Sequence, residues 1–358
     1  MVSDQTTAAP GSRTGVLVNV AAFVVITAGL KAASDLVILV LAALFLAIAV
    51  APPIFFLQRK GVPFILGMVI VLSAAIGLLG AMAGLIGTSI TQFRSQLPAY
   101  EAMIGHHYES LNAWTEEFGF GVELESQLAN LVDPGKALNL VASLFAGVGS
   151  VLANGFLIFI MVLFLLLEAS SLPGKMQVAF GGKDLHLSQF RQLFESVNRY
   201  LVMKTWISLL TGVLAGGLCA VVGVDFPILW GLLAFLLNYI PNVGSILAAI
   251  PPTLLALVQL GGGSSLTIIA GFLVINNVLG NIVEPRIMGQ GLGLSPFAVL
   301  LSLVFWGWVL GPVGMLLSIP LTMGVKIAME GGKDTQWIAV LLGSGEAPKP
   351  PEPAAEEA

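Results

Sequence analysis

The sequence predicts an all-α integral membrane protein with about eight transmembrane helices. Of its 358 residues, 57% are hydrophobic and 10% are charged, whereas soluble domains carry about 25% charged residues. The mean hydropathy is +0.95, and the apolar residues form repeated runs close to the roughly 20 residues that a crossing helix needs. The single cysteine, Cys219, lies in one of these runs, which excludes a disulfide framework.

The first two apolar runs, residues 16–30 and 36–57, predict a hairpin of two spans, because Lys31 and Asp35 place a polar turn between them. A secretory signal peptide is the alternative interpretation of the first run. It is disfavoured because only Arg13 precedes the run and a full span follows at once.

Glycine pairs at small-xxx-small spacing occur in three of the predicted spans. This spacing lets helix backbones approach closely, but glycine is also common in membrane helices, so both interpretations stay open. The pairs are Gly80/Gly84 in the third span (residues 62–90), Gly212/Gly216 and Gly307/Gly311.

Residues 91–145 form a sizeable segment between spans. Apolar residues recur there every three or four positions, which predicts an amphipathic helical cap. The adjacent His106 and His107 cannot share a helix face and predict no metal site.

Residues 148–167 predict the fourth span. In residues 169–204 an apolar stripe lies opposite charged residues, which is typical of a helix in the interface plane. A short soluble helix packed on the spans is the alternative.

The region over residues 205–330 is the predicted transport core, and its helices are broken. Residues 228–240 and 246–260 flank Pro241-Asn242-Val243-Gly244-Ser245. Both stretches are shorter than a full span, which predicts a broken, re-entrant hairpin near residues 228–260. Spans over 265–283, 296–310 and 313–329 follow.

A weak internal repeat accompanies these breaks. Residues 244–253 are similar to residues 314–322, and a Trp-Gly pair precedes each segment, at Trp230 and at Trp306. Paired, Gly/Pro-interrupted segments indicate the binding site of a transporter. The similarity is short and needs a gap of one residue, so chance is the alternative.

Charge fixes the expected orientation. With the N-terminus inside, only Lys31, Arg94 and Lys136 of the 15 basic residues lie outside, so both termini are expected in the cytoplasm. The expected organisation is a disordered N-terminus (1–14), three spans (15–90), an extracytoplasmic helical segment (91–145), a fourth span (146–168), cytoplasmic interfacial helices (169–204), the transport core (205–330) and a cytoplasmic tail (331–358) that is disordered from about residue 345.

Polar residues end the span over residues 265–283 and predict a functional site. Asn277, Asn281 and Glu284 share one helix face at about 3.6 residues per turn, and such groups are expensive in lipid. Pro285 disfavours helical geometry at Glu284, so we expect the helix to break or end there. A broken helix is tolerated at membrane depth where it lines a cavity or is buried in protein.

The carboxamides in the two broken segments suit a neutral, hydroxyl-rich solute, because they offer both donors and acceptors in place of water. For any single asparagine, an interhelical hydrogen bond that holds the bundle together is the alternative. The predicted substrate-binding residues are Asn238, Pro241, Asn242, Gly244, Ser245, Asn277 and Asn281.

Glu284 is the candidate coupling residue, because a low-dielectric site can raise the pKa of a carboxyl group into a range where it exchanges protons. An ion pair with Arg286 is the structural alternative, and the two residues form the predicted coupling or ion site. Asp225, which precedes Pro227 closely, predicts a helix N-cap rather than an ion site.

Two motifs carry a resemblance to a known family. Pro241-Asn242-Val-Gly-Ser is the first, and Asn277-x3-Asn281-x2-Glu284-Pro285-Arg286-x2-Gly289 followed by Leu294-Ser295-Pro296 is the second. With these motifs the chain resembles the autoinducer-2 exporter-like permease family over roughly residues 15–330. The loop at Arg59-Lys60 is less basic than is usual in that family, and residues 91–145 are the least similar part. Further agreement lies in Phe164 to Glu168, Arg199-Tyr200, Trp306-Gly307-x3-Gly311 and Ile319-Pro320.

The resemblance implies a multi-pass transporter in the bacterial cytoplasmic membrane. It further implies a homo-oligomer, expected to be a pentamer, in which the second-half spans move relative to a scaffold. The substrates it implies are a small furanose-derived quorum-sensing signal and, in some members, Na⁺ or Li⁺ exchanged for protons.

Three functions stay open: an exporter of a small polar metabolite or autoinducer-2-like signal, an Na⁺(Li⁺)/H⁺ antiporter, and a non-transporting scaffold whose residues 91–145 bind a partner. No HExxH, GxSxG or P-loop motif is present, so no enzyme and no catalytic residue are predicted. H⁺ or Na⁺ as a coupling ion is the one expected cofactor. No basic stripe indicates nucleic acid, and the expected partners are a small polar solute, the lipid bilayer and further copies of the chain.

Overall fold

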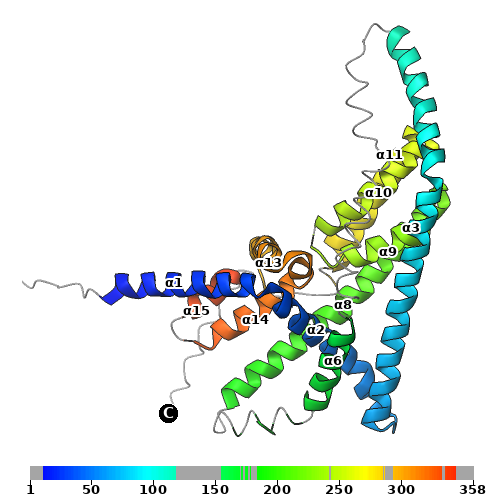
Figure 1. The fold of residues 1–358 in the computed structure, drawn as a ribbon. Coiled ribbons are helices and arrows are strands. Elements are labelled where there is room, and N and C mark those ends of the chain that lie inside the picture. Colours follow the sequence, from blue (N-terminus) through cyan, green and yellow to red (C-terminus); the bar gives the residue numbers. More distant parts are fainter. Residues whose placement is uncertain are drawn as a thin grey trace, which may run out of the picture.

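The structure is a computed structural model that describes residues 11–117, 155–169, 184–241, 243–284, 293–332 and 335–343, with 171, 174, 175, 178 and 286 between them. Its elements are all helices (Figure 1). They are α1 (Gly11–Ala32), α2 (Ser34–Arg59), α3 (Phe64–Glu117), α6 (Gly155–Ala169), α8 (Asp184–Val222), α9 (Pro227–Leu237), α10 (Val243–Leu260), α11 (Gly262–Asn276), the π-helix η1 (Asn277–Val283), α13 (Pro296–Leu316), α14 (Ser318–Glu330) and α15 (Gln336–Leu342).

The described helices confirm the all-α membrane class. Six of them are long and apolar enough to cross a bilayer, and three more are shorter apolar helices. Large apolar side chains cover much of the surface, such as Phe23, Leu78 and Trp206, as expected where the solvent is lipid. The six are Ser34–Arg59, Phe64–Gln96, Arg191–Val222, Val243–Leu260, Gly262–Val283 and Pro296–Leu316.

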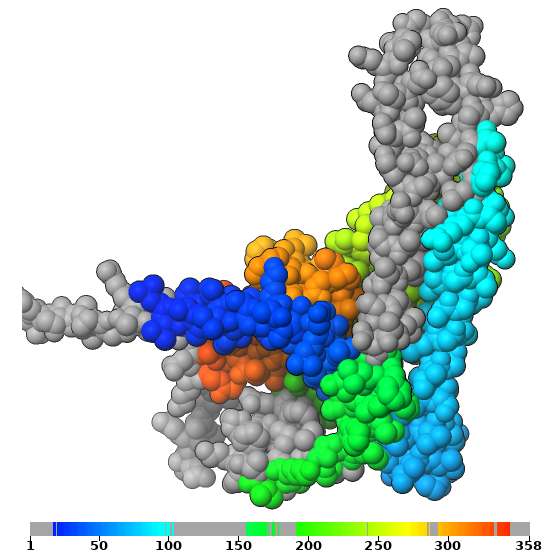
Figure 2. Space-filling model, viewed as in Figure 1, coloured from blue at the N-terminus to red at the C-terminus, as the bar shows by residue number. Residues whose placement is uncertain are grey.

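Two helices run through boundaries that the sequence analysis predicted. The predicted cytoplasmic interfacial helices end at residue 204, yet α8 continues to Val222 without a break. Likewise α3 continues from its span to Glu117, so the first part of the predicted segment 91–145 belongs to the same helix. The reason is local: neither junction carries a glycine or proline that would end a helix. Figure 1 shows α3 as one long, bent helix beside α9 and α10, and Figure 2 shows α1 projecting from the body.

The expected broken hairpin corresponds to α9 and α10, but only α9 is shorter than a full span. The predicted second arm, residues 246–260, begins earlier, at Val243, and the 18 residues of α10 are long enough to cross a bilayer. The 11 residues of α9 rise about 16 Å, roughly half the thickness of the hydrocarbon core. Phe226, which precedes α9, has a left-handed backbone with φ 60°. The predicted span over residues 313–329 is the last turn of α13 together with α14, because Gly311 (φ 64°) kinks α13.

Close helix contact decides the role of the glycine pairs. A Cβ on Gly212 would lie 2.7 Å from the Gly231 carbonyl oxygen, and a Cβ on Gly216 would lie 3.0 Å from that of Pro227. The Gly212/Gly216 pair therefore lets α8 and α9 touch. At Gly80 and Gly84, nothing in the described residues lies within 4 Å of such a Cβ.

The internal repeat has a structural counterpart. A Cβ on Gly244 would overlap the carbonyl oxygen of Leu237, and one on Gly314 would overlap that of Trp306. Each glycine thus lies where a second helix turns back against the first, after the break at 238–242 and after the kink at Gly311. This shared backbone contact supports the repeat as a structural feature.

Asp225 does not cap a helix, contrary to the sequence prediction. The N-cap of α9 is Phe226, without a side-chain cap. Asp225 Oδ2 instead accepts hydrogen bonds from the Tyr100 hydroxyl (2.8 Å) and from Gln259 Nε2, and the Asp225 N–H donates to Gln259 Oε1 (3.2 Å). Tyr100 of α3 and Gln259 of α10 reach the carboxylate because both helices meet the turn between α8 and α9.

We expect Tyr100→Phe to lower stability by about 1.5–3 kcal/mol, because it removes a hydrogen bond to a charged group. Thr88→Val, on the exposed face of the same helix, is the control. Burial, together with the hydrogen bond and the negative charge of Asp225, raises the pKa of Tyr100 above its ordinary 10.0. The folded protein therefore holds the hydroxyl proton of Tyr100 more tightly than the unfolded chain does. The contribution of this hydroxyl group to the stability of the fold is complete below pH 10.0 and is lost as the pH rises further. Thermal unfolding of both variants at neutral and alkaline pH checks this, and a Tyr100→Phe profile parallel to that of the unmodified chain would contradict it.

Candidate functional site

An ion pair between a buried lysine and a half-buried glutamate joins α8 to the end of η1. Lys204 Nζ lies 2.8 Å and 3.0 Å from the two carboxylate oxygens of Glu284, and the two side chains are 4% and 21% exposed. The structural alternative predicted Arg286 as the partner, but Arg286 is exposed and Lys204 takes this place. Two charges withdrawn from water need close geometry and further hydrogen bonds, so the pair is a costly feature at this position.

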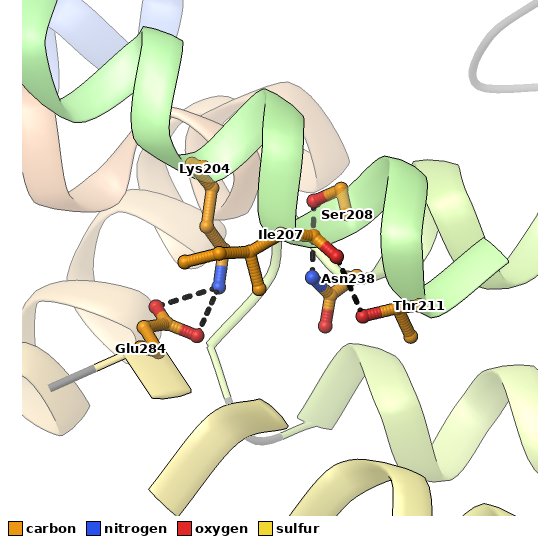
Figure 3. A network of polar contacts seen from close by, with 6 residues as sticks. All are labelled: Lys204, Ile207, Ser208, Thr211, Asn238 and Glu284. Carbon is orange, nitrogen blue, oxygen red and sulfur yellow. Dashed lines mark hydrogen bonds and ion pairs between the residues drawn. The ribbon is translucent and has the colours of Figure 1, made fainter. Parts of the chain in front are cut away.

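The polar groups continue along one face of α8. Ser208 and Thr211 follow Lys204 at helical spacing and are buried. Asn238 Nδ2 donates to Ser208 Oγ at 3.0 Å, and Thr211 Oγ1 donates to the Ile207 carbonyl at 2.8 Å. Figure 3 shows these side chains in a row beside α8, with Glu284 at one end and Asn238 beside Ser208. We call Lys204, Ser208, Asn238 and Glu284 the polar network.

Asn238 and Glu284, the two residues that face α8, both lie at helix ends. Asn238 is the C-cap of α9, where the chain leaves the helix for the hairpin turn. Glu284 is the C-cap of η1, whose π-helical geometry begins at Asn277. Single π-helical turns are frequent at functional sites, and the proline at position 285 disfavours continuation of the helix.

The other predicted site residues are distributed differently. Asn281 Nδ2 donates to Asn277 Oδ1 at 3.0 Å, and Asn277 Nδ2 donates to the Leu273 carbonyl at 2.8 Å. Both asparagines are exposed. Within the described residues no hydrogen bond joins them to the polar network, so the structure separates Asn277 and Asn281 from Glu284. In the hairpin turn Pro241 is half-buried, Gly244 is buried and Ser245 is half-buried on α10. Asn242 lies outside the described residues.

Sequence reasoning missed Lys204, Ser208 and Thr211. Their signal was present: Lys204 and Ser208 are one turn apart within a helix that continues into apolar sequence. The sequence analysis places Lys204 at the cytoplasmic border of the membrane, because the predicted interfacial segment ends at residue 204. A lysine inside a membrane helix points by default to a functional site.

A groove of about 620 Å³ opens between α3, α8 and α9. Its walls are apolar apart from Thr205, whose hydroxyl lies 2.7 Å from the Tyr239 hydroxyl and also bonds the Leu201 carbonyl. With its one hydroxyl already bonded, this groove does not suit a polar solute. The chemistry for such a solute lies in the polar network.

Apolar helices that hold a charged pair, hydroxyls and a carboxamide between a broken hairpin and a π-helical end define a membrane transport protein. The comparison with protein families agrees, since the AI-2E family transporter description matches residues 20–333. The chain belongs to this family.

Relatives cover nearly all of the chain. The AI-2 transport protein TqsA of Escherichia coli (strain K12) is 41% identical over 327 residues, which are 91% of this chain and 95% of the relative. The putative transport protein YhhT of the same strain is 37% identical over 92% of this chain and 94% of its own length. A putative transport protein of Haemophilus influenzae is 36% identical over 92% of this chain and 96% of its own length.

Proposed function

We propose that the chain is a secondary transporter that exports a small polar metabolite or signal across the bacterial cytoplasmic membrane. One observation carries this proposal: the Lys204–Glu284 ion pair lies between membrane helices, and a second polar pair, Ser208 and Asn238, follows one turn further along α8. Such an arrangement is costly in lipid, and it offers alternating donors and acceptors to a solute that leaves water. The name of the TqsA relative, an AI-2 transport protein, supports a signal of that kind.

The proposal gives each group a role and assigns no chemical reaction to the chain. Asn238 and Ser208 bond hydroxyl groups of the solute, and the turn residues Pro241 and Gly244 shape the hairpin that presents Asn238. Asn242, Ser245, Asn277 and Asn281 remain proposed solute contacts for other stages of transport. Glu284 is the coupling group, with a proton as the coupling ion, and Arg286 is its proposed second partner at the helix end.

An Na⁺(Li⁺)/H⁺ antiporter is the second candidate, favoured by the largely buried Glu284 carboxylate. It differs in a measurable way: adding Na⁺ or Li⁺ to proteoliposomes with an internal pH dye would move protons, and Glu284→Gln would abolish the response. We expect no cation response, and proton movement that is lost in this variant would make the antiporter the primary function.

We propose that both termini are cytoplasmic and that the chain forms a homo-oligomer in the bilayer, expected to be a pentamer. The long apolar span of α3 supports assembly, because within the described residues nothing lies within 4 Å of a Cβ at Gly77, Gly80, Gly84 or Gly87. This glycine-lined face is open to close approach by another helix.

Asn238→Ala tests the solute role. We expect AI-2 efflux from loaded proteoliposomes to fall about tenfold or more, because the solute loses its proposed hydrogen bond to Asn238, and the loss of such a bond costs about 1–3 kcal/mol. Asn276→Ala is the control, since Asn276 precedes the π-helix and lies outside the polar network. Equal efflux from both variants, at equal amounts of folded protein, would contradict the role of Asn238.

A further inference from the structure

Tyr200 has a buried hydroxyl that the polar network does not use. The residue is 1% exposed, and its Oη has no hydrogen-bond partner in the part of the chain that the structure describes. A buried donor without a partner is costly and rare in folded proteins. Phenylalanine would fill the same apolar surroundings without this cost, so the hydroxyl calls for a use in another state of the protein.

The position of Tyr200 relates it to Glu284. Tyr200 precedes Lys204 by one turn of α8, so both lie on one face. Helical side chains lean toward the N-terminus, which brings the Lys204 ammonium over the turn that carries Tyr200. Tyr200 is buried in one cluster with Leu279 of η1, the π-helix whose C-cap is Glu284.

The other candidate donors for the Glu284 carboxylate either have a hydrogen-bond partner already or are exposed. The Tyr239 hydroxyl is bonded to Thr205 at 2.7 Å, and Arg286 is exposed. Lys204 supplies the bonds to both Glu284 oxygens, yet an ionised carboxylate has about four acceptor sites. If Lys204 turned away, the carboxylate would need a new donor at once, because an unpaired buried charge is strongly unfavourable.

We propose that Tyr200 is the reserve donor of the site: when Lys204 turns from Glu284 to bond the solute, the Tyr200 hydroxyl takes over the carboxylate. This inference rests on the proposed function only for what draws Lys204 away. Lys204 has three N–H donors and can serve a solute hydroxyl or anionic group. Tyr200 is then a positioning residue that acts through Glu284 and keeps the solute-bound state satisfied inside the membrane.

A double-mutant cycle tests the exchange of partners without any solute. The thermal midpoint is measured for the purified unmodified protein, Tyr200→Phe, Lys204→Met and the double variant. Methionine cannot donate a hydrogen bond to Glu284, so we expect Tyr200→Phe to leave the midpoint unchanged or raised on its own, and to lower it by about 4 °C in the Lys204→Met background. Tyr239→Phe is the matched control and should act equally in both backgrounds. An equal effect of Tyr200→Phe in both would overturn the proposal.

A second measurement serves if Lys204→Met does not fold. The maximal rate of AI-2 efflux should fall about tenfold in Tyr200→Phe at an unchanged thermal midpoint, because the solute-bound state loses a hydrogen bond to a charged group. An unchanged maximal rate would overturn the proposal. A third outcome separates the two proposals. If Tyr200→Phe acts differently in the two backgrounds of the cycle but the unmodified protein shows no AI-2 efflux, the proposed transport is contradicted and the exchange of partners is still supported.

Discussion

Lys204→Met should reduce stability by about 3–5 kcal/mol, because it leaves the negative charge of the largely buried Glu284 carboxylate without its cationic partner. The 4% exposure of the lysine side chain and the 21% exposure of the glutamate mean that water replaces little of the lost interaction. The expected result is a sharp drop in the amount of monodisperse protein and in its thermal midpoint. Arg199→Met, at an exposed position on the same helix, is the control and should change both little.

The double variant Lys204→Met/Glu284→Leu separates stability from function. Replacing a buried ion pair by apolar residues of similar volume is often neutral or stabilising, so we expect the double variant to fold about as well as the unmodified protein. It should not transport, because the charged end of the polar network is gone. Efflux from the double variant at the unmodified rate would mean that the pair is a structural contact only.

Gly244→Ala should cost about 3 kcal/mol or more, at the upper end of overpacking effects. A Cβ at this position would overlap a backbone atom, the carbonyl oxygen of Leu237, and a backbone atom cannot turn aside as a side chain can. The α9–α10 hairpin would have to open, and Asn238 would move from Ser208. We expect little folded protein, measured by size-exclusion chromatography and thermal unfolding.

Gly217→Ala is the matched control for this substitution, since a Cβ on Gly217 meets nothing within 4 Å in the described residues and alanine favours the helix. Gly314→Ala should resemble Gly244→Ala, because its Cβ would overlap the Trp306 carbonyl oxygen. Normal yield and stability of Gly244→Ala would show that the hairpin is looser than described and would remove the basis for placing Asn238.

The membrane class and the broken hairpin could be predicted from the sequence because both depend on local patterns. Apolar runs indicate a lipid environment directly, and the Pro241-Asn242 interruption indicates the end of α9, whereas α10 begins at Val243 and reaches span length. The same locality explains why the predicted borders at residues 90 and 204 are not helix ends. These borders followed changes in polarity, whereas α3 continues to Glu117 and α8 to Val222.

The site was only partly predictable, because its decisive contacts join distant residues. Glu284 stood out as a carboxylate at the end of an apolar run, but its partner Lys204 is 80 residues away. Arg286 was the nearest cation along the chain and therefore the natural guess. The prediction for Asp225 was wrong for the same reason. Its position close to Pro227 suggested a helix N-cap, while its hydrogen-bond partner Tyr100 is 125 residues away. No spacing rule within one chain reveals such pairs.

The most direct test of the central claim is AI-2 efflux from loaded proteoliposomes under an imposed pH gradient, with the unmodified protein beside Glu284→Gln. Glu195→Gln, at an exposed position on α8, controls for the loss of a carboxylate elsewhere. The polar network as transport site predicts efflux from the unmodified protein and the control, and loss of efflux in Glu284→Gln at an equal amount of folded protein. Equal efflux from all three proteins would contradict the claim that the Lys204–Glu284 pair carries transport.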